Sequence, residues 1–179
     1  MIAARAVHEE SADTVLVRDA MRGDRAAFGR LYERYARAIH GILLAHVSFS
    51  DAEDLLQDVF ITALERIPQL RAENAFGGWL AAIARNRARE FYRRPRTEPA
   101  DELERLPQKP VPTEAFEVLS KIRKLPACYS ETLILRFVEG MTGPEIAERT
   151  GLTADSVRVN LCRGMKLLRE QLSSRGENL

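Results

Sequence analysis

The stretch TGPEIAERTGLTADSVRVNLCRGMKLLRE, residues 142–170, has the pattern of two helices joined by a tight turn. Thr142 and Glu145 have the spacing of a capping box, in which each side chain bonds the backbone N–H of the other residue. Gly151 suits the left-handed conformation that ends many helices, and Thr153 can cap the helix that follows. The pattern predicts a helix-turn-helix, a unit that can place its second helix in the major groove of DNA.

The second of these helices has a narrow apolar seam opposite a polar outer face. At about 100° per residue, four of its residues fall within about 60° of one another. They are Val157, Leu161, Gly164 and Leu168. We expect the outer side of this helix and its cap to contact DNA through Thr153, Ser156, Arg158, Val159, Cys162, Arg163 and Lys166. A short helical hairpin can imitate the motif, but the glycine, both caps and the basic outer face agree here.

Length and composition exclude several classes of protein. The chain has 179 residues, of which 45% are hydrophobic, so it has room for one domain or two small ones with real cores. No apolar run is long enough to span a membrane, so we expect no membrane insertion. The first 13 residues lack the apolar core of a signal peptide. We therefore expect a cytoplasmic protein.

The cysteines and histidines suggest no special chemistry. Cys128 and Cys162 are far apart and form no CxxC motif, which fits a reducing compartment. We predict that both thiols pack as small hydrophobic groups rather than acting in redox chemistry. His8, His40 and His46 make no metal-ligand pattern. We therefore expect neither a metal site nor a cofactor.

Apolar periodicity predicts an all-α chain, with no strand pattern of useful length. Helices are expected at residues 13–22, 24–46, 51–67, 79–94, 113–124, 127–138, 143–150 and 153–172. Residues 95–112 hold five prolines and little periodic apolar content, which is typical of an extended linker. The predicted organisation is a disordered extension (1–12), a first small helical domain (13–94), a flexible proline-rich linker (95–112) and a second helical domain (113–179) that contains the helix-turn-helix.

The stretch DAEDLLQDVFITALERI, residues 51–67, contains five acids and one base. Four of the acids share a stripe about 60° wide, away from the apolar face: Asp51, Asp54, Asp58 and Glu65. The helix dipole and a capping box formed by Ser50 and Glu53 would explain the acids of the first turn. They would not explain Asp58, which repels Asp54 at a spacing of four residues. A solvated face and a binding face are equal alternatives.

The helix expected at 79–94 has a basic stripe opposite its apolar face. Three arginines recur every four residues beside an amide and a ring: Arg85, Arg89, Arg93, Asn86 and Tyr92. Arginines bind phosphates, and aromatic rings offer stacking surfaces to unpaired bases. A basic run is usually only a solvated face, but these neighbours favour a nucleic-acid strand.

Four stretches, in this order, resemble the extracytoplasmic-function sigma factors, the small alternative specificity subunits of bacterial RNA polymerase. They are AFGRLYERYA, DAEDLLQDVFITAL, FGGWLAAIARNRAREFYRR and the unit that begins LPACYSETLILRFVEGMTGPEIAERTGLT. The likeness covers roughly residues 13 to 172. The ordered set is far more specific than any one piece.

The resemblance implies a binding role for the acidic stripe. In this family the similar helix docks on the clamp helices of the polymerase β′ subunit. The implied polymerase contacts are Asp51, Asp54, Leu55, Gln57, Asp58 and Phe60. The resemblance also implies contact with the β subunit and a dedicated anti-sigma factor that masks the polymerase-binding surface.

The resemblance divides promoter binding between the two domains. The implied residues for reading and opening the −10 element are Phe76, Trp79, Arg85, Asn86, Arg89, Tyr92 and Arg93. Phe76 would lie in a base-capturing loop, and Trp79 has core packing as an alternative. The helix-turn-helix would read the −35 element as duplex. There Val159, Asn160 and Cys162 depart from the residues that relatives often carry, so the −35 sequence can differ from the usual one.

Two other functions fit part of the sequence. A helix-turn-helix regulator that is not a polymerase subunit would have no use for the acidic stripe or the Trp79 segment. A hydrolase or nuclease is disfavoured, because the acids form one helical stripe without a His or Lys beside them rather than a converging pocket. We therefore expect a chain that is not an enzyme and has no catalytic residues.

Overall fold

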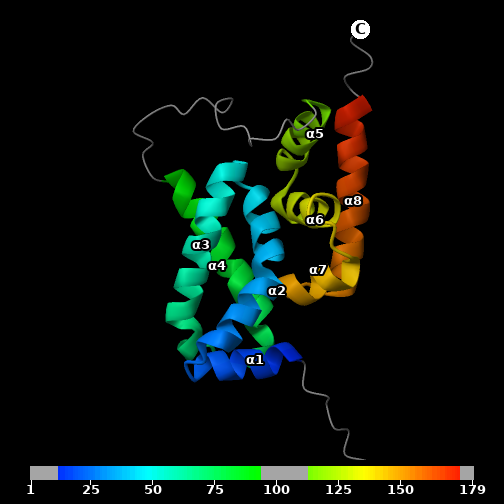
Figure 1. The fold of residues 1–179 in the computed structure, drawn as a ribbon. Helices are drawn as coiled ribbons and strands as arrows, with labels where there is room; N and C mark the ends of the chain where they lie inside the picture. Colours follow the sequence, from blue (N-terminus) through cyan, green and yellow to red (C-terminus); the bar gives the residue numbers. More distant parts are fainter. Residues whose placement is uncertain (1–11, 94–112, 174–179) are drawn as a thin grey trace, which may run out of the picture.

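A computed structural model of the chain describes residues 12–93 and 113–173, with side chains from Phe116 onward in the second range (Figure 1). Its helices are α1 (Ala12–Met21), α2 (Arg25–Leu44), α3 (Phe49–Arg66), α4 (Phe76–Arg93), α5 (Thr113–Arg123), α6 (Ala127–Phe137), α7 (Gly143–Thr150) and α8 (Ala154–Ser173). Two short 3₁₀ turns, η1 (Ile67–Gln69) and η2 (Glu73–Ala75), join α3 to α4. The described residues contain no strand, which confirms the all-α prediction. The predicted linker, nearly all of the N-terminal extension and the last six residues lie outside the described ranges.

Helix α3 begins two residues before the expected start, because Ser48 rather than Ser50 caps it. The Ser48 hydroxyl accepts a hydrogen bond from the backbone N–H of Asp51 at 3.2 Å and donates one to the Asp51 carboxylate at 2.5 Å. The predicted capping box of Ser50 and Glu53 is therefore wrong. Pro68 lies in η1, directly after the helix, as expected of a residue that cannot continue the hydrogen-bond ladder.

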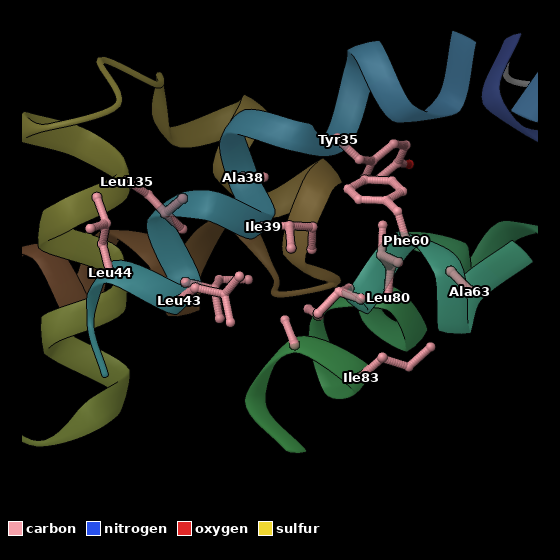
Figure 2. Close-up of a cluster of buried hydrophobic side chains, with 14 of the residues drawn as sticks. Tyr35, Ala38, Ile39, Leu43, Leu44, Phe60, Ala63, Leu80, Ile83 and Leu135 are labelled. Atoms are coloured by element: carbon pink, nitrogen blue, oxygen red, sulfur yellow. The ribbon is translucent and has the colours of Figure 1, made fainter. Parts of the chain in front are cut away.

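Helices α1 to α4 form the first unit, with α2 at its centre (Figure 1). Figure 2 shows Ile39 and Leu43 of α2 facing Leu80 of α4, with Phe60 of α3 beside them. All four side chains are buried. Each helix turns most of its apolar side chains inward, as amphipathic periodicity predicts.

Helices α5 to α8 form the second unit. The capping box of Thr142 and Glu145 is present, and Gly151 ends α7 in the left-handed conformation with φ +73°. Thr153 then caps α8 by accepting a hydrogen bond from the backbone N–H of Ser156 at 3.1 Å. A Cβ added at Gly164 would lie 3.1 Å from a methyl of Leu133, so this glycine lets α8 approach α6 closely. These contacts confirm the predicted helix-turn-helix.

The two units are in direct contact, which the two-domain prediction did not anticipate. Helix α2 lies against α6 and α7, and α4 lies against α7. Figure 2 shows Leu135 of α6 next to the end of α2. Leu133, Ile134 and Leu135 are all buried, and the apolar core continues from one unit into the other.

Candidate nucleic-acid and protein interfaces

The acidic stripe lies on the outer face of α3. Asp54, Gln57 and Asp58 are exposed, and no described base forms an ion pair with either aspartate. Two large apolar side chains follow them on the same face: Ile61 is 58% exposed and Leu64 is 45% exposed. Protein interfaces commonly combine apolar and polar side chains in this way. The sequence contained a signal for it, because at about 100° per residue Ile61 falls between Gln57 and Asp54.

Three of the expected polymerase contacts are buried. Asp51 is 5% exposed and belongs to the cap of α3. Leu55 packs in the core, and the ring of Phe60 lies 4.6 Å from the ring of Tyr32 between centroids. We therefore correct the prediction that these three side chains contact a partner. They are buried and hold α3 in place within the first unit. At about 100° per residue, Leu55 falls on the same side of α3 as the buried Val59 and Ala63, so periodicity alone favours the inner face for it.

The basic stripe of α4 reaches the surface through four of its five residues. Asn86, Arg89, Tyr92 and Arg93 are exposed, and the Arg89 guanidinium donates to the Asn86 side-chain oxygen at 3.3 Å. Tyr92 is 60% exposed, and its hydroxyl donates to the backbone carbonyl of His46. The ring face and the guanidinium groups are therefore available together.

The aromatic residues at the start of α4 are placed differently from the prediction. Phe76 is the first residue of the helix and only 1% exposed, with its ring edge-on to Tyr35 at 5.1 Å. It belongs to the core, so its expected role in a base-capturing loop is corrected. Trp79 is half-buried and packs on Phe76 with ring centroids 5.8 Å apart. Part of the Trp79 side chain therefore packs against the core, and the rest of it remains accessible.

Arg85 points to the second unit rather than to solvent. Its guanidinium donates to the Glu131 carboxylate of α6 at 2.8 Å, and His46 lies 3.0 Å from the other oxygen of the same group. Burial alone would raise the pKa of Glu131, but the hydrogen bonds from His46 and Arg85 outweigh it and hold this pKa below its ordinary value. Glu131 is thus a buried anion, and Arg85 is corrected from a free phosphate ligand to an ion-pair partner.

The outer face of α8 has the expected composition. Thr153, Arg158, Val159, Cys162, Arg163 and Lys166 are exposed, and Ser156 is half-buried in the cap. The inner seam is confirmed, since Val157, Gly164 and Leu168 are buried and Leu161 is half-buried. The Asn160 amide donates to Thr132 of α6 at 3.4 Å, so it faces away from the outer surface.

Both thiols are accessible. Cys128 lies near the start of α6 and Cys162 on the outer face of α8, and both are free and exposed. The prediction that they pack as small hydrophobic groups is wrong. Within residues 12–93 and 113–173, no three His, Cys, Asp or Glu side chains gather as metal ligands, and no helix is long and apolar enough to cross a membrane.

The chain matches known families over both units. Residues 31–97 match Sigma-70 region 2, and residues 115–168 match Sigma-70, region 4. An ECF RNA polymerase sigma-E factor from Haemophilus influenzae is 31% identical over 92% of this chain and 97% of its own length. The RNA polymerase sigma factor CnrH from Cupriavidus metallidurans is 28% identical over 96% of this chain and all of its own length.

A solved structure of a relative agrees with these matches. CnrH in complex with the cytosolic domain of CnrY superposes with a TM-score of 0.62 at 27% identity, covering 90% of this chain and 97% of that chain. The ordered pair of sigma regions, the near full-length identity and the exposed faces described above agree: the chain belongs to the ECF sigma factors of RNA polymerase.

Proposed function

We propose that the chain binds core RNA polymerase through its first unit, places its second unit on the −35 duplex and holds unpaired −10 bases. The polymerase makes the RNA, and this chain supplies no catalytic group. The domain limits follow the proposed division of labour: 13–94 for the first unit, 95–112 for the linker and 113–179 for the second. The observation that supports it best is that regions 2 and 4 occur in order in one chain, each with an exposed face of suitable charge.

The polymerase contact is assigned to the outer face of α3. Asp54, Gln57 and Asp58 would form its polar part, and Ile61 and Leu64 its apolar part. The partner is the clamp helices of β′, for which we infer a surface with basic side chains around an apolar groove. Burying two exposed apolar side chains would add to binding, because the stabilisation scales with the apolar area removed from water.

The promoter contacts are assigned to α4 and α8. Asn86, Arg89, Tyr92 and Arg93 would hold the opened −10 strand, with the exposed part of Trp79 at the start of the same helix. Arginines attract the backbone and rings stack on bases, which suits a single strand. The outer face of α8 would enter the major groove at −35, as helix-turn-helix recognition helices do.

We further propose an anti-sigma partner and action in the cytoplasm. The solved relative CnrH is in complex with the cytosolic domain of another protein, CnrY. A partner that covered the α3 face would keep this chain from polymerase. The alternative of a helix-turn-helix regulator outside the polymerase does not explain the match to region 2 or the exposed Ile61 and Leu64.

The test is binding to purified core polymerase by gel filtration. The wild-type chain should elute with the core enzyme, and the complex should retain promoter DNA that the core alone releases. Asp54→Ala with Asp58→Ala should weaken this binding about tenfold, the effect of losing about 1.4 kcal/mol. Glu33→Ala changes an exposed acid of α2 and serves as the matched control.

The outcomes separate the candidate functions. A chain that binds promoter DNA but never elutes with the core enzyme would be a free regulator, not a sigma subunit. A double variant that binds core polymerase as tightly as the wild type would mean that the acidic stripe is only a solvated face.

A further inference from the structure

Residues 67–75 form the turn that leads from α3 into α4, and α1 packs against this turn. The turn contains η1 and η2, and α1 lies across the end of the first unit where both are found (Figure 1). Ile67 and Leu70 are buried there. From Arg71 to Ala75, every residue except the half-buried Glu73 is exposed. One side of the turn is therefore anchored in the protein, and the other side faces water.

Arg18 of α1 forms a two-point ion pair with Glu73, the first residue of η2. The Arg18 Nε donates to one carboxylate oxygen at 2.9 Å, and a terminal nitrogen of the same guanidinium donates to the other at 2.8 Å. Such a fork fixes the orientation of both groups as well as their distance. The hydrogen bonds from Arg18 hold the pKa of Glu73 below its ordinary value, so this carboxylate is charged at neutral pH.

The turn lies at the end of the face of α4 that we assign to the −10 strand. At about 100° per residue, Ala82, Asn86, Arg89 and Arg93 fall within about 60° of one another, and all four are exposed. Continued toward the start of the helix, this line passes beside Trp79 and reaches η2. A strand bound along α4 would therefore meet the exposed side of the turn.

The turn depends on a support from outside itself. η2 is a single 3₁₀ turn of three residues, and 3₁₀ hydrogen bonds have poorer geometry than those of an α-helix. Helix α1 is a firm support, because Leu16, Val17 and Ala20 are buried in the core. A segment that is already ordered binds a ligand better, since its conformational freedom is not lost on binding.

We propose that Arg18 is a positioning residue for the −10 strand: through Glu73 it holds the turn before α4 in the conformation that binds unpaired DNA, without touching the DNA itself. This inference rests on the proposed function of α4. It gives α1 a part in promoter opening, although α1 carries none of the residues that we assign to the strand.

The charge of Glu73 separates positioning from simple electrostatics. Glu73 is an acid close to a face that would bind a polyanion, so on charge alone its removal should strengthen binding. If it holds the turn in place, its removal should weaken binding instead. The pair is also partly exposed, and exposed ion pairs contribute little to global stability. We therefore expect variants of either residue to fold.

The test is binding of a labelled oligonucleotide to the complex of the full chain with core polymerase, followed by fluorescence anisotropy. The oligonucleotide is the single nontemplate strand across the −10 element, located from the mapped start of a run-off transcript. The variants are Arg18→Ala, Glu73→Ala and the two together. Arg22→Ala is the matched control, because Arg22 is on the same helix, 73% exposed and 3.9 Å from Asp19. Circular dichroism reports helix content, and affinity for the core enzyme is measured separately.

Arg18→Ala and Glu73→Ala should each weaken strand binding about fivefold, the result expected if the turn keeps its binding conformation about one fifth of the time without the ion pair. The double variant should bind no more weakly than either single variant, because both changes break the same contact. Arg22→Ala should bind as the wild type does. Helix content and affinity for the core enzyme should be unchanged throughout.

Tighter or unchanged strand binding by Glu73→Ala would overturn the proposal, and so would losses that multiply in the double variant or an equal loss in Arg22→Ala. Loss of helix content or of core binding in the single variants would assign the pair to folding and would also overturn it. A wild-type complex that does not bind the strand would contradict the proposed function of α4. Failure of the positioning role alone leaves that function standing.

Discussion

Ser48 and Thr142 start α3 and α7 in the same way. In each case the hydroxyl accepts a hydrogen bond from the backbone N–H three residues later, and the acid at that position bonds back to the capping residue. The acids are Asp51 and Glu145. Both are explained by helix capping, so an acid in the first turn of a helix is weak evidence of a binding surface.

Thr142→Ala should lower the free energy of unfolding by about 1 kcal/mol, because the backbone N–H of Glu145 loses its acceptor, the Thr142 hydroxyl. Urea unfolding followed by circular dichroism measures the change. Thr142→Asn keeps an acceptor at the cap and should unfold near the wild-type midpoint. If the alanine and asparagine variants have the same urea midpoint, the side-chain cap does not contribute to stability.

Arg163 and Arg158 should differ in what they read. On α8, Arg163 lies about 45° from the centre of the outer face and Arg158 about 95° away, and Arg158 pairs with Asp155 at 3.2 Å. Arg163→Ala should cost about 1–3 kcal/mol on the correct −35 sequence and relax preference at one base pair. Arg158→Ala should weaken binding nearly uniformly and lower the salt slope by about one.

The measurement is binding of the complex with core polymerase to promoter fragments that carry single-base changes at −35, at several salt concentrations. An Arg163→Ala variant that loses the same affinity on every fragment would show that α8 enters the groove in another orientation.

At the scale of helices, caps and periodicity predicted nearly every element, and tertiary contacts explain where they failed. Helix α4 begins at Phe76, three residues before the predicted start, although Gly77 and Gly78 have low helix propensity. Position 77 requires a residue without a side chain because the backbone of α7 lies directly against it, at Glu148 and Arg149. These two residues are 71 and 72 positions further along the chain. Periodicity within one helix has no information about such a neighbour.

Some of the predicted site residues are placed differently for a related reason. The resemblance to a family identifies matching positions but does not show which side chains are buried, and Leu55, Phe60 and Phe76 pack inside. Ile61 and Leu64 were not among the predicted contacts, although at about 100° per residue both fall beside Gln57 on the outer face.

Ile61→Ser with Leu64→Ser should weaken binding to core polymerase by about tenfold or more, since two apolar groups would no longer be buried in the interface. Thermal stability should stay near that of the wild type, because both side chains are mostly in water in the free chain. Leu172→Ser, at an exposed apolar position near the end of α8, is the control. Fluorescence anisotropy of a labelled chain titrated with core enzyme measures the affinity. Unchanged affinity in the double variant would show that Ile61 and Leu64 do not contribute to the polymerase interface.

At the scale of the whole molecule, the sequence predicted two helical units but not their contact. Arg85, Glu131 and Arg149 are of residue types that usually lie at the surface. Arg85 nevertheless forms an ion pair with Glu131, which is 46 positions away in the sequence. Charged residues that pair across a domain contact cannot be distinguished by type from charged residues in water. The exposed Cys128 and Cys162 show the converse, since residues that are usually buried lie outside here.

The central claim is that the chain directs core RNA polymerase to a promoter. Run-off transcription tests it most directly, with purified core enzyme, the full chain and a linear DNA that contains the region upstream of the chain's own gene. We predict one transcript with a defined start that requires both the chain and the core enzyme and falls with Asp54→Ala and Asp58→Ala. A folded chain that binds core polymerase and yet yields no transcript beyond that of the core enzyme alone, on this DNA and on genomic fragments, would contradict the account.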